Sequence, residues 1–298
     1  MGDTATQTVE QTAFSSKQRF QRTLKDKASF TGVGLHTGSP VTVEFCPASA
    51  GTGIVFRRTD LEGCPEIEAR VENVGETMRS TTIGQGNVMV TTVEHVIATL
   101  RAYQIDNVYV DISAAEPPVG NGSANIFVDM VEKAGIVELE ETVTVVALKE
   151  AVFFSSGDIH LVAVPHDGYK ISYTLSYPKS PVLRAQYFSI EINQETFKKE
   201  IAPCRTFSLY EELSILMDRG LIKGGSLDNA VVVKDDVIIS KDGLVFPDEM
   251  VRHKILDLLG DLSLIGYPFH AHIIAIKSGH ASNVAFAKKL NEQMESLR

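Results

Sequence analysis

The chain has 298 residues, of which 44% are hydrophobic and 22% are charged, and 38 acidic against 28 basic residues give a net charge of −10. This composition is typical of one large or two medium globular domains, and it excludes disorder, collagen and coiled coil. Without a lysine or arginine cluster, the acidic balance also excludes a general nucleic-acid binder, because such binding depends on neutralising phosphates.

The first 19 residues are rich in Thr, Gln and Ser, and we expect them to form a mobile N-terminal extension. They contain no basic-then-apolar signal, and no apolar run in the chain approaches the roughly 20 residues of a membrane-spanning helix. We therefore expect a cytoplasmic protein without a transmembrane segment. The mostly acidic stretch Glu138 to Glu141 lies between two sets of strands and helices and is the best candidate for a linker. It divides the chain into predicted domains at 20–142 and 143–298.

Strands and helices follow one another in mixed order along both parts. Alternating apolar residues predict strands at 41–45, 108–112, 159–163 and 188–192. Helical spacing predicts one helix that starts near Ser123 and ends at Gly135, and a last helix that opens at Asn283. Because the regular alternation of a parallel α/β sheet is missing, the pattern favours an α+β fold.

The most informative helix covers residues 250–261. His253, Asp257 and Asp261 lie at positions i, i+4 and i+8, so an imidazole and two carboxylates share one face, while leucine and isoleucine cover the rest. Pairs at i, i+4 are common on solvated helix surfaces, which is the plainer interpretation. This helix is too apolar to be exposed, however, and a buried polar face needs a metal, a cavity or partner charges.

A second polar pair opens a helix at 91–100. Thr91 and Glu94 have the spacing of a capping box, so Glu94 could be a capping glutamate and His95 a partly exposed histidine. In the functional interpretation, His95 is a metal ligand and Glu94 a base, as in helical metalloprotease motifs. The second helical histidine of those motifs is missing, but His253 and Asp257 could complete a three-ligand zinc set that leaves the fourth position for water. Glu94 could then take a proton from that water.

A third candidate is His280, which follows a glycine just before the last predicted helix. It is either an ordinary loop histidine, with Asn283 as the helix cap, or a group that projects into a cleft as an acid held protonated by Asp261. Thr206, in the turn before Phe207, offers a hydroxyl that could bond an oxyanion.

These residues belong to five motifs that follow one another along the chain: Gly32-Val33-Gly34-Leu35-His36-Thr37-Gly38, Thr92-Val93-Glu94-His95, Arg205-Thr206-Phe207, Val251-Arg252-His253-Lys254-x-x-Asp257-x-x-Gly260-Asp261 and Gly279-His280-x-x-Asn283. In this order they resemble the UDP-3-O-acyl-N-acetylglucosamine deacetylase family, the zinc enzymes of lipid A biosynthesis in Gram-negative bacteria. The resemblance extends from about Gln21 to Leu290.

The resemblance implies two α+β halves of similar topology, with helices packed on sheets and the active site between the halves. It implies zinc held by His95, His253 and Asp257, with Glu94 as general base. Ferrous iron is a possible alternative metal for such a ligand set.

The family pattern also implies roles for groups around the metal. His280 would stabilise the oxyanion and protonate the leaving amine, Asp261 would orient His280, and Thr206 would contact the oxyanion. Lys254 and Phe207 would bind substrate.

In the family, an insert in the second half forms an apolar passage for the acyl chain. It corresponds here to about 208–233 and would be lined by Leu213, Ile222, Gly225, Ala230 and Val232.

We therefore expect a monomeric zinc amidohydrolase that acts on a small-molecule substrate. It would remove the N-acetyl group of UDP-3-O-acyl-N-acetylglucosamine as acetate and leave the free amine, an early step of lipid A synthesis. Two alternatives remain at this point: a zinc amidohydrolase of another N-acyl sugar or peptide, and a non-catalytic module with a structural zinc.

Overall fold

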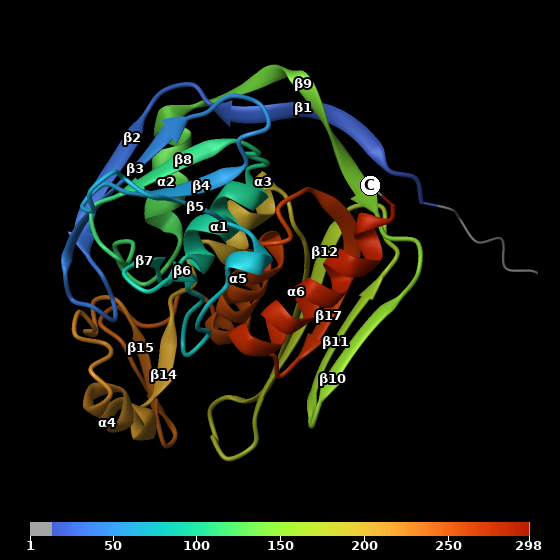
Figure 1. Cartoon of the computed structure of the whole chain (residues 1–298). Coiled ribbons are helices and arrows are strands. Elements are labelled where there is room, and N and C mark those ends of the chain that lie inside the picture. Colours follow the sequence, from blue (N-terminus) through green and yellow to red (C-terminus); the bar gives the residue numbers. More distant parts are fainter. Residues whose placement is uncertain (1–13, 298) are drawn as a thin grey trace, which may run out of the picture.

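Two sheets with the same strand connections enclose the central helices of the computed structural model, which describes residues 14–297 (Figure 1). The first sheet has the order β2-β3-β8-β4-β5, and the second contains the order β10-β11-β17-β12-β13. The strands of the first sheet are β2 (Ala28–Val33), β3 (Pro40–Pro47), β4 (Ile54–Arg58), β5 (Glu66–Glu68) and β8 (Val108–Ile112). Those of the second are β10 (Val152–Ser156), β11 (Ile159–Val164), β12 (Tyr169–Tyr177), β13 (Arg184–Glu191) and β17 (Phe269–Ile276).

The two halves repeat one topology. In each sheet the first two strands form an antiparallel hairpin, and the third strand lies parallel to the last (β4 with β8, β12 with β17). A helix precedes that last strand, α1 (Glu94–Ala102) or α5 (Glu249–Ser263), and another follows it, α2 (Asn125–Ala134) or α6 (His280–Glu295). The prediction of two similar α+β halves is confirmed.

The remaining elements are short. In the first half they are a 3-10 turn (Val71–Asn73) and the hairpin of β6 (Ile83–Gln85) and β7 (Val88–Val90). In the second half, α3 (Gln194–Thr196) continues into a π-helical turn (Phe197–Ile201). The predicted insert forms a separate small sheet of β14 (Phe207–Leu209), β15 (Val231–Lys234) and β16 (Val237–Ile239), accompanied by α4 (Tyr210–Asp218). Within residues 14–297, no helix combines the length and the apolar character needed to span a membrane.

The predicted linker at 138–141 is wrong. These residues lie inside β9 (Ile136–Ala147), which pairs along its length with β1 (Lys17–Leu24) and reaches β17 at its far end. Each of the three glutamates in this stretch is exposed, so their charge reflects a solvated strand rather than a loop. The extension predicted at 1–19 also ends too late, because β1 begins at Lys17; residues 1–13 lie outside the described part of the chain.

Both predicted helix starts near the ends of the halves shift. The helix predicted from Ser123 begins at Asn125, whose amide donates to Ser123 Oγ, and it ends at Gly135 as expected. The last helix begins at His280 rather than Asn283, because Ser282 Oγ accepts the amide proton of Gly279 and caps the helix there.

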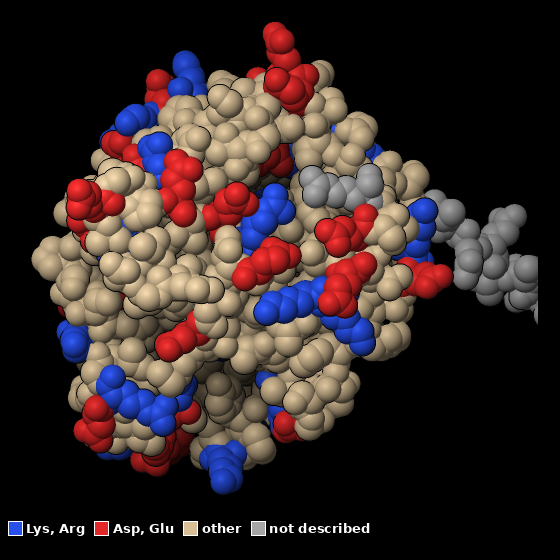
Figure 2. All heavy atoms as spheres, viewed as in Figure 1, with Lys and Arg blue, Asp and Glu red and all other residues tan. Residues whose placement is uncertain are grey.

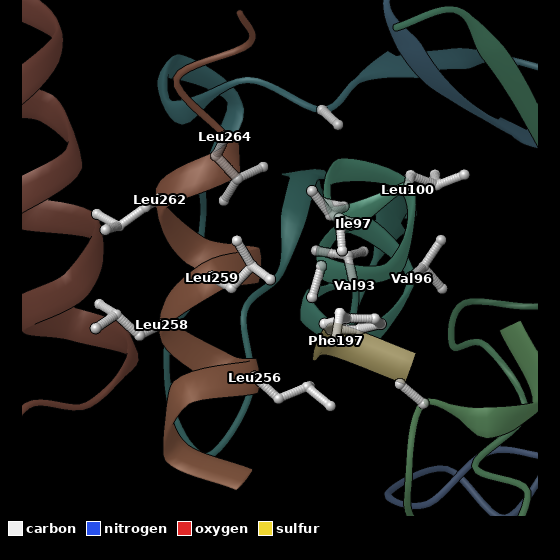
Figure 3. Close-up of a cluster of buried hydrophobic side chains, with 14 of the residues drawn as sticks. Val93, Val96, Ile97, Leu100, Phe197, Leu256, Leu258, Leu259, Leu262 and Leu264 are labelled. Atoms are coloured by element: carbon white, nitrogen blue, oxygen red, sulfur yellow. The ribbon is translucent and has the colours of Figure 1, made fainter. Parts of the chain in front are cut away.

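The equivalent helices α1 and α5 pack against each other at the centre of the molecule. Figure 3 shows Leu259 of α5 directed at Ile97 of α1, while Leu258 and Leu262 point to α6 on the other side. Gly260 lets the two backbones approach, since a Cβ there would lie 2.2 Å from the carbonyl oxygen of Glu94. Glycine at this position therefore sets the distance between the two helices that carry the candidate site.

Candidate active site

A cavity of about 770 Å³ lies between the two halves and contains the polar faces of α1 and α5. The face drawn in Figure 2 is hollowed beside the lobe that carries α4. The walls of the cavity come from loops and strand ends of both halves, including Leu35 and His36, the end of β12, and the segment 277–282. Most of the predicted catalytic and metal-binding residues line this cavity: Glu94, His95, Thr206, His253, Asp257 and His280.

The three predicted metal ligands meet across the α1–α5 contact. Nε2 of His95 lies 3.6 Å from Oδ1 of Asp257, and Nε2 of His253 lies 3.3 Å from the same oxygen. The two imidazole rings are nearly perpendicular, at 83°, with their centroids 5.0 Å apart. Atoms bound to one tetrahedral zinc ion at 2.0–2.2 Å lie about 3.3–3.6 Å from each other. The separations and the two-nitrogen, one-oxygen donor set therefore fit zinc.

The surroundings hold two of these ligands, His253 and Asp257, in the protonation states that a metal requires. The backbone carbonyl of Cys204 lies 3.0 Å from Nδ1 of His253, which leaves Nε2 facing the other ligands. Burial lowers the pKa of His253 to about 4, so its imidazole is neutral. For Asp257, burial alone would raise the pKa, but the ammonium of Lys254, 2.7 Å from Oδ2, holds it well below its usual value.

Glu94 is buried beside this group. One carboxylate oxygen accepts the amide proton of Thr81 at 3.0 Å, which fixes the side chain toward the cavity. Burial raises the pKa of Glu94, because few polar groups replace the water that would solvate its charge. A carboxylate with a raised pKa is better matched to accepting a proton near neutral pH. The capping box of Thr91 with Glu94 is wrong. The helix begins at Glu94, and the Thr91 hydroxyl forms hydrogen bonds with the hydroxyls of Ser80 and Thr82 instead.

His280, the first residue of α6, contacts a buried carboxylate. Its Nδ1 lies 3.0 Å from Oδ2 of Asp261, which also accepts a proton from the amide of Asn283, while Oδ1 accepts the hydroxyl proton of Thr81. Burial opposes a charge on His280, but the Asp261 carboxylate and Glu94 outweigh it and raise its pKa to about 9. The imidazole is therefore a cation at neutral pH.

The predicted substrate contacts divide into two groups. Thr206, Phe207 and Lys254 line the cavity, with the Lys254 ammonium 5.6 Å from the centroid of the Phe207 ring. The five residues predicted for the acyl passage are not among those lining it and are half-buried or exposed in the small sheet lobe: Leu213, Ile222, Gly225, Ala230 and Val232. Their role stays a prediction.

The sequence analysis missed two residues that hold the site together. Thr81 connects Glu94 to Asp261, yet it lies in an irregular stretch where no periodic pattern marks it. The buried Glu116 lies in a loop after β8 and also gave no signal. Asn283 was interpreted as a helix cap, but its side chain instead donates to Asp261.

Comparison with known proteins gives one consistent family. Residues 21–292 match the LpxC family model, described as UDP-3-O-acyl N-acetylglycosamine deacetylase. Similar curated proteins carry the name UDP-3-O-acyl-N-acetylglucosamine deacetylase. The one from Chlamydia pneumoniae is 52% identical over 279 residues, covering 93% of this chain and 99% of its own. The one from Chlamydia trachomatis serovar D is 48% identical over 277 residues, covering 93% and 96%.

The matched region contains both sheets, both central helices and every residue of the cavity described above. The chain therefore belongs to the LpxC family, UDP-3-O-acyl N-acetylglycosamine deacetylase.

Proposed function

We propose that this protein is a zinc-dependent deacetylase that hydrolyses the N-acetyl group of UDP-3-O-acyl-N-acetylglucosamine in lipid A synthesis. Family membership supports the substrate and the reaction. The observation that carries the zinc assignment is the convergence of two imidazole nitrogens and one carboxylate oxygen at 3.3 and 3.6 Å, with a base and a cationic imidazole in the same cavity. The protein would act in the cytoplasm as a monomer.

In this proposal His95, His253 and Asp257 hold the metal. Zinc bound there would polarise the acetyl carbonyl and lower the pKa of a water molecule. Glu94 accepts a proton from the attacking water as its oxygen adds to the acetyl carbon.

The protonated His280 faces the oxyanion that develops on the carbonyl oxygen, and Thr206 offers a second donor. The carbon–nitrogen bond then breaks, His280 gives its proton to the departing nitrogen, and acetate and the free amine result. Asp261 keeps His280 protonated and oriented, as its 3.0 Å contact supports.

Lys254 and Phe207 are proposed to bind the substrate beside the metal. The lobe of β14, α4, β15 and β16 would carry the acyl chain along Leu213, Ile222, Gly225, Ala230 and Val232. The apolar side chains Ile215 and Met217 that α4 exposes make this lobe suited to contact with a hydrocarbon chain.

Acetate release from UDP-3-O-acyl-N-acetylglucosamine tests the function. The purified protein is assayed as prepared, after chelation, and after addition of one equivalent of zinc or ferrous ion. We expect chelation to abolish acetate release and one of these metals to restore it. Substrates without the acyl chain or without uridine diphosphate serve as controls. Equal rates on all of them would show a less selective amidohydrolase, and activity that survives complete metal removal would refute the zinc mechanism.

A further inference from the structure

One motif has no role in the proposed mechanism: the glycine-rich segment 32–38, which covers the end of β2 and most of the turn before β3. Its loop, residues 34–38, folds around the carboxylate of Glu116, which is only 1% exposed. The amides of His36 and Thr37 donate to this carboxylate at 2.9 and 2.8 Å, and the Thr37 hydroxyl donates at 2.8 Å. The hydroxyl of Thr92 donates to Oε1 of Glu116 at 3.0 Å, whereas both Thr37 groups donate to Oε2. One buried carboxylate thus joins this loop to the segment that leads into Glu94.

The carboxylate of Glu116 accepts hydrogen bonds from two backbone amides and two hydroxyls. Within residues 14–297 no lysine or arginine forms an ion pair with it, so backbone amides and hydroxyls stabilise its charge. Such charge-assisted hydrogen bonds are stronger than neutral ones. The loop is also fitted to the carboxylate sterically, since a Cβ on Gly34 would lie 2.4 Å from Oε2 of Glu116.

The same loop contacts both the cavity and the lobe proposed to bind the acyl chain. Leu35 and His36 line the cavity. Their carbonyl oxygens accept the amide protons of Gly224 and Lys223, at 3.0 and 3.2 Å. The backbones approach so closely that a Cβ on Gly224 would lie 2.2 Å from the carbonyl oxygen of Gly34. The loop is therefore a backbone connection between the lobe and the first half, in addition to the ion pair of Arg79 with Glu212 at 2.8 Å.

The repeated topology gives Glu116 a notable position. It lies four residues after the end of β8, and His280 lies four residues after the end of β17, the equivalent strand of the second half. Both side chains are buried, His280 at the start of α6, where it lines the cavity, and Glu116 in the loop between β8 and α2. The position after the last strand that holds the proposed acid in the second half thus holds an anchoring carboxylate in the first.

We propose that Glu116 is a positioning residue that fixes loop 34–38 and so aligns the lobe with the metal site. This inference rests on the proposed function only for its consequence: the alignment lets the deacetylase distinguish acylated substrates from short ones. Its structural part, that Glu116 holds segment 222–225 through the loop, does not depend on the reaction.

The variant Glu116→Gln tests both parts. The amide group keeps the size of the side chain but places an NH₂ among donors, so at least one of the hydrogen bonds is lost. We expect the amides of segment 222–225 to exchange with deuterium about tenfold faster, because their hydrogen-bond acceptors are no longer held. We also expect kcat/KM for the acylated substrate to fall about 100-fold through misplacement of the lobe. The loss on a substrate without the acyl chain should be much smaller, and one zinc per chain should remain.

Two further variants and a control complete the test. Gly224→Ala disturbs the same contact from the lobe and should speed amide exchange in loop 34–38, and Thr37→Ala should give a weaker form of the Glu116→Gln result. These two decide the question if Glu116→Gln does not fold. Glu44→Gln is the matched control, because it removes a carboxylate of the same half that pairs with the exposed Lys27. It should change neither the amide exchange of segment 222–225 nor kcat/KM.

Unchanged exchange at 222–225 in Glu116→Gln would overturn the proposal, as would an equal loss of kcat/KM on acylated and short substrates. Failure of the wild-type protein to release acetate would instead refute the proposed function, and the exchange measurement would still decide the role of Glu116.

Discussion

Replacing Gly260 by alanine should separate the two helices that carry the metal ligands. The added Cβ would lie 2.2 Å from the carbonyl oxygen of Glu94 and 2.8 Å from its Cα and carbonyl carbon. These are backbone atoms, so no side-chain rotation can relieve the contact.

The displacement follows from contact distances. Non-bonded carbon atoms are optimally about 3.5–4.0 Å apart, so relief requires a movement of at least about 0.7 Å between α1 and α5. Added to the 3.6 Å between His95 Nε2 and Asp257 Oδ1, this gives about 4.3 Å, beyond the roughly 3.6 Å that one tetrahedral zinc ion spans. Overpacking of this kind also costs about 1–3 kcal/mol of stability.

Zinc content and chelator competition measure the effect. We expect Gly260→Ala to lose zinc at chelator concentrations at least tenfold below those that strip the wild type, and to unfold at a lower temperature. Ser263→Ala, on the same helix, is the control, because it removes a hydroxyl that bonds Leu259 without adding an atom to the interface. A Gly260→Ala protein that keeps one zinc with wild-type resistance to chelation would show that Gly260 does not set the ligand geometry.

Three further predictions concern single side chains. Glu94→Ala should retain zinc but lose roughly 10²- to 10⁴-fold in kcat, the usual share of acid–base catalysis, and an unchanged kcat would remove Glu94 from the mechanism. Because His280 must be protonated and its pKa is about 9, kcat/KM should decline as the pH rises through that value. Asp261→Asn removes the negative charge that raises the pKa of His280 against the effect of burial, so this decline should move to lower pH. A pH profile with the same basic limb would contradict the assignment. Glu249→Gln leaves the buried guanidinium of Arg205, 2.8 Å away, without a charged partner and should lower the free energy of unfolding by about 3–5 kcal/mol; a loss below about 1 kcal/mol in urea unfolding would refute this.

The central helices could be predicted because their signal is local. The apolar run around His253 predicted a helix at 250–261, and the structure extends it only to Glu249–Ser263. Alternation marked four strands of the two sheets in the same way: β3, β8, β11 and β13. The acidic stretch in β9 was misinterpreted because its stability comes from distant pairing with β1, including the contact of Arg22 with Glu138 at 3.0 Å, which no local pattern reveals.

The residues of the candidate site likewise divide into those that a local pattern marks and those that only the folded structure brings together. Helical spacing brought Asp257 and His253 together, and ligand chemistry indicated His95 as their partner across the halves. Thr81 and Glu116 were missed because single polar residues in irregular segments look alike whether they are exposed or buried. Their roles depend on which donors and acceptors the fold brings to them, and that is a property of the packed chain.

The unbroken course of β9 limits how the molecule can move. Because this strand is paired with β1 along most of its length and is joined to β17 at Val146 and Ala147, the crossing between the halves has no free swivel. A rigid rotation of one half against the other would break the hydrogen bonds of these strand pairs. It would also separate the packed apolar side chains of α1 and α5. Substrate entry and product release therefore depend on movement of the loops around the cavity, while α1 and α5 beneath it stay fixed.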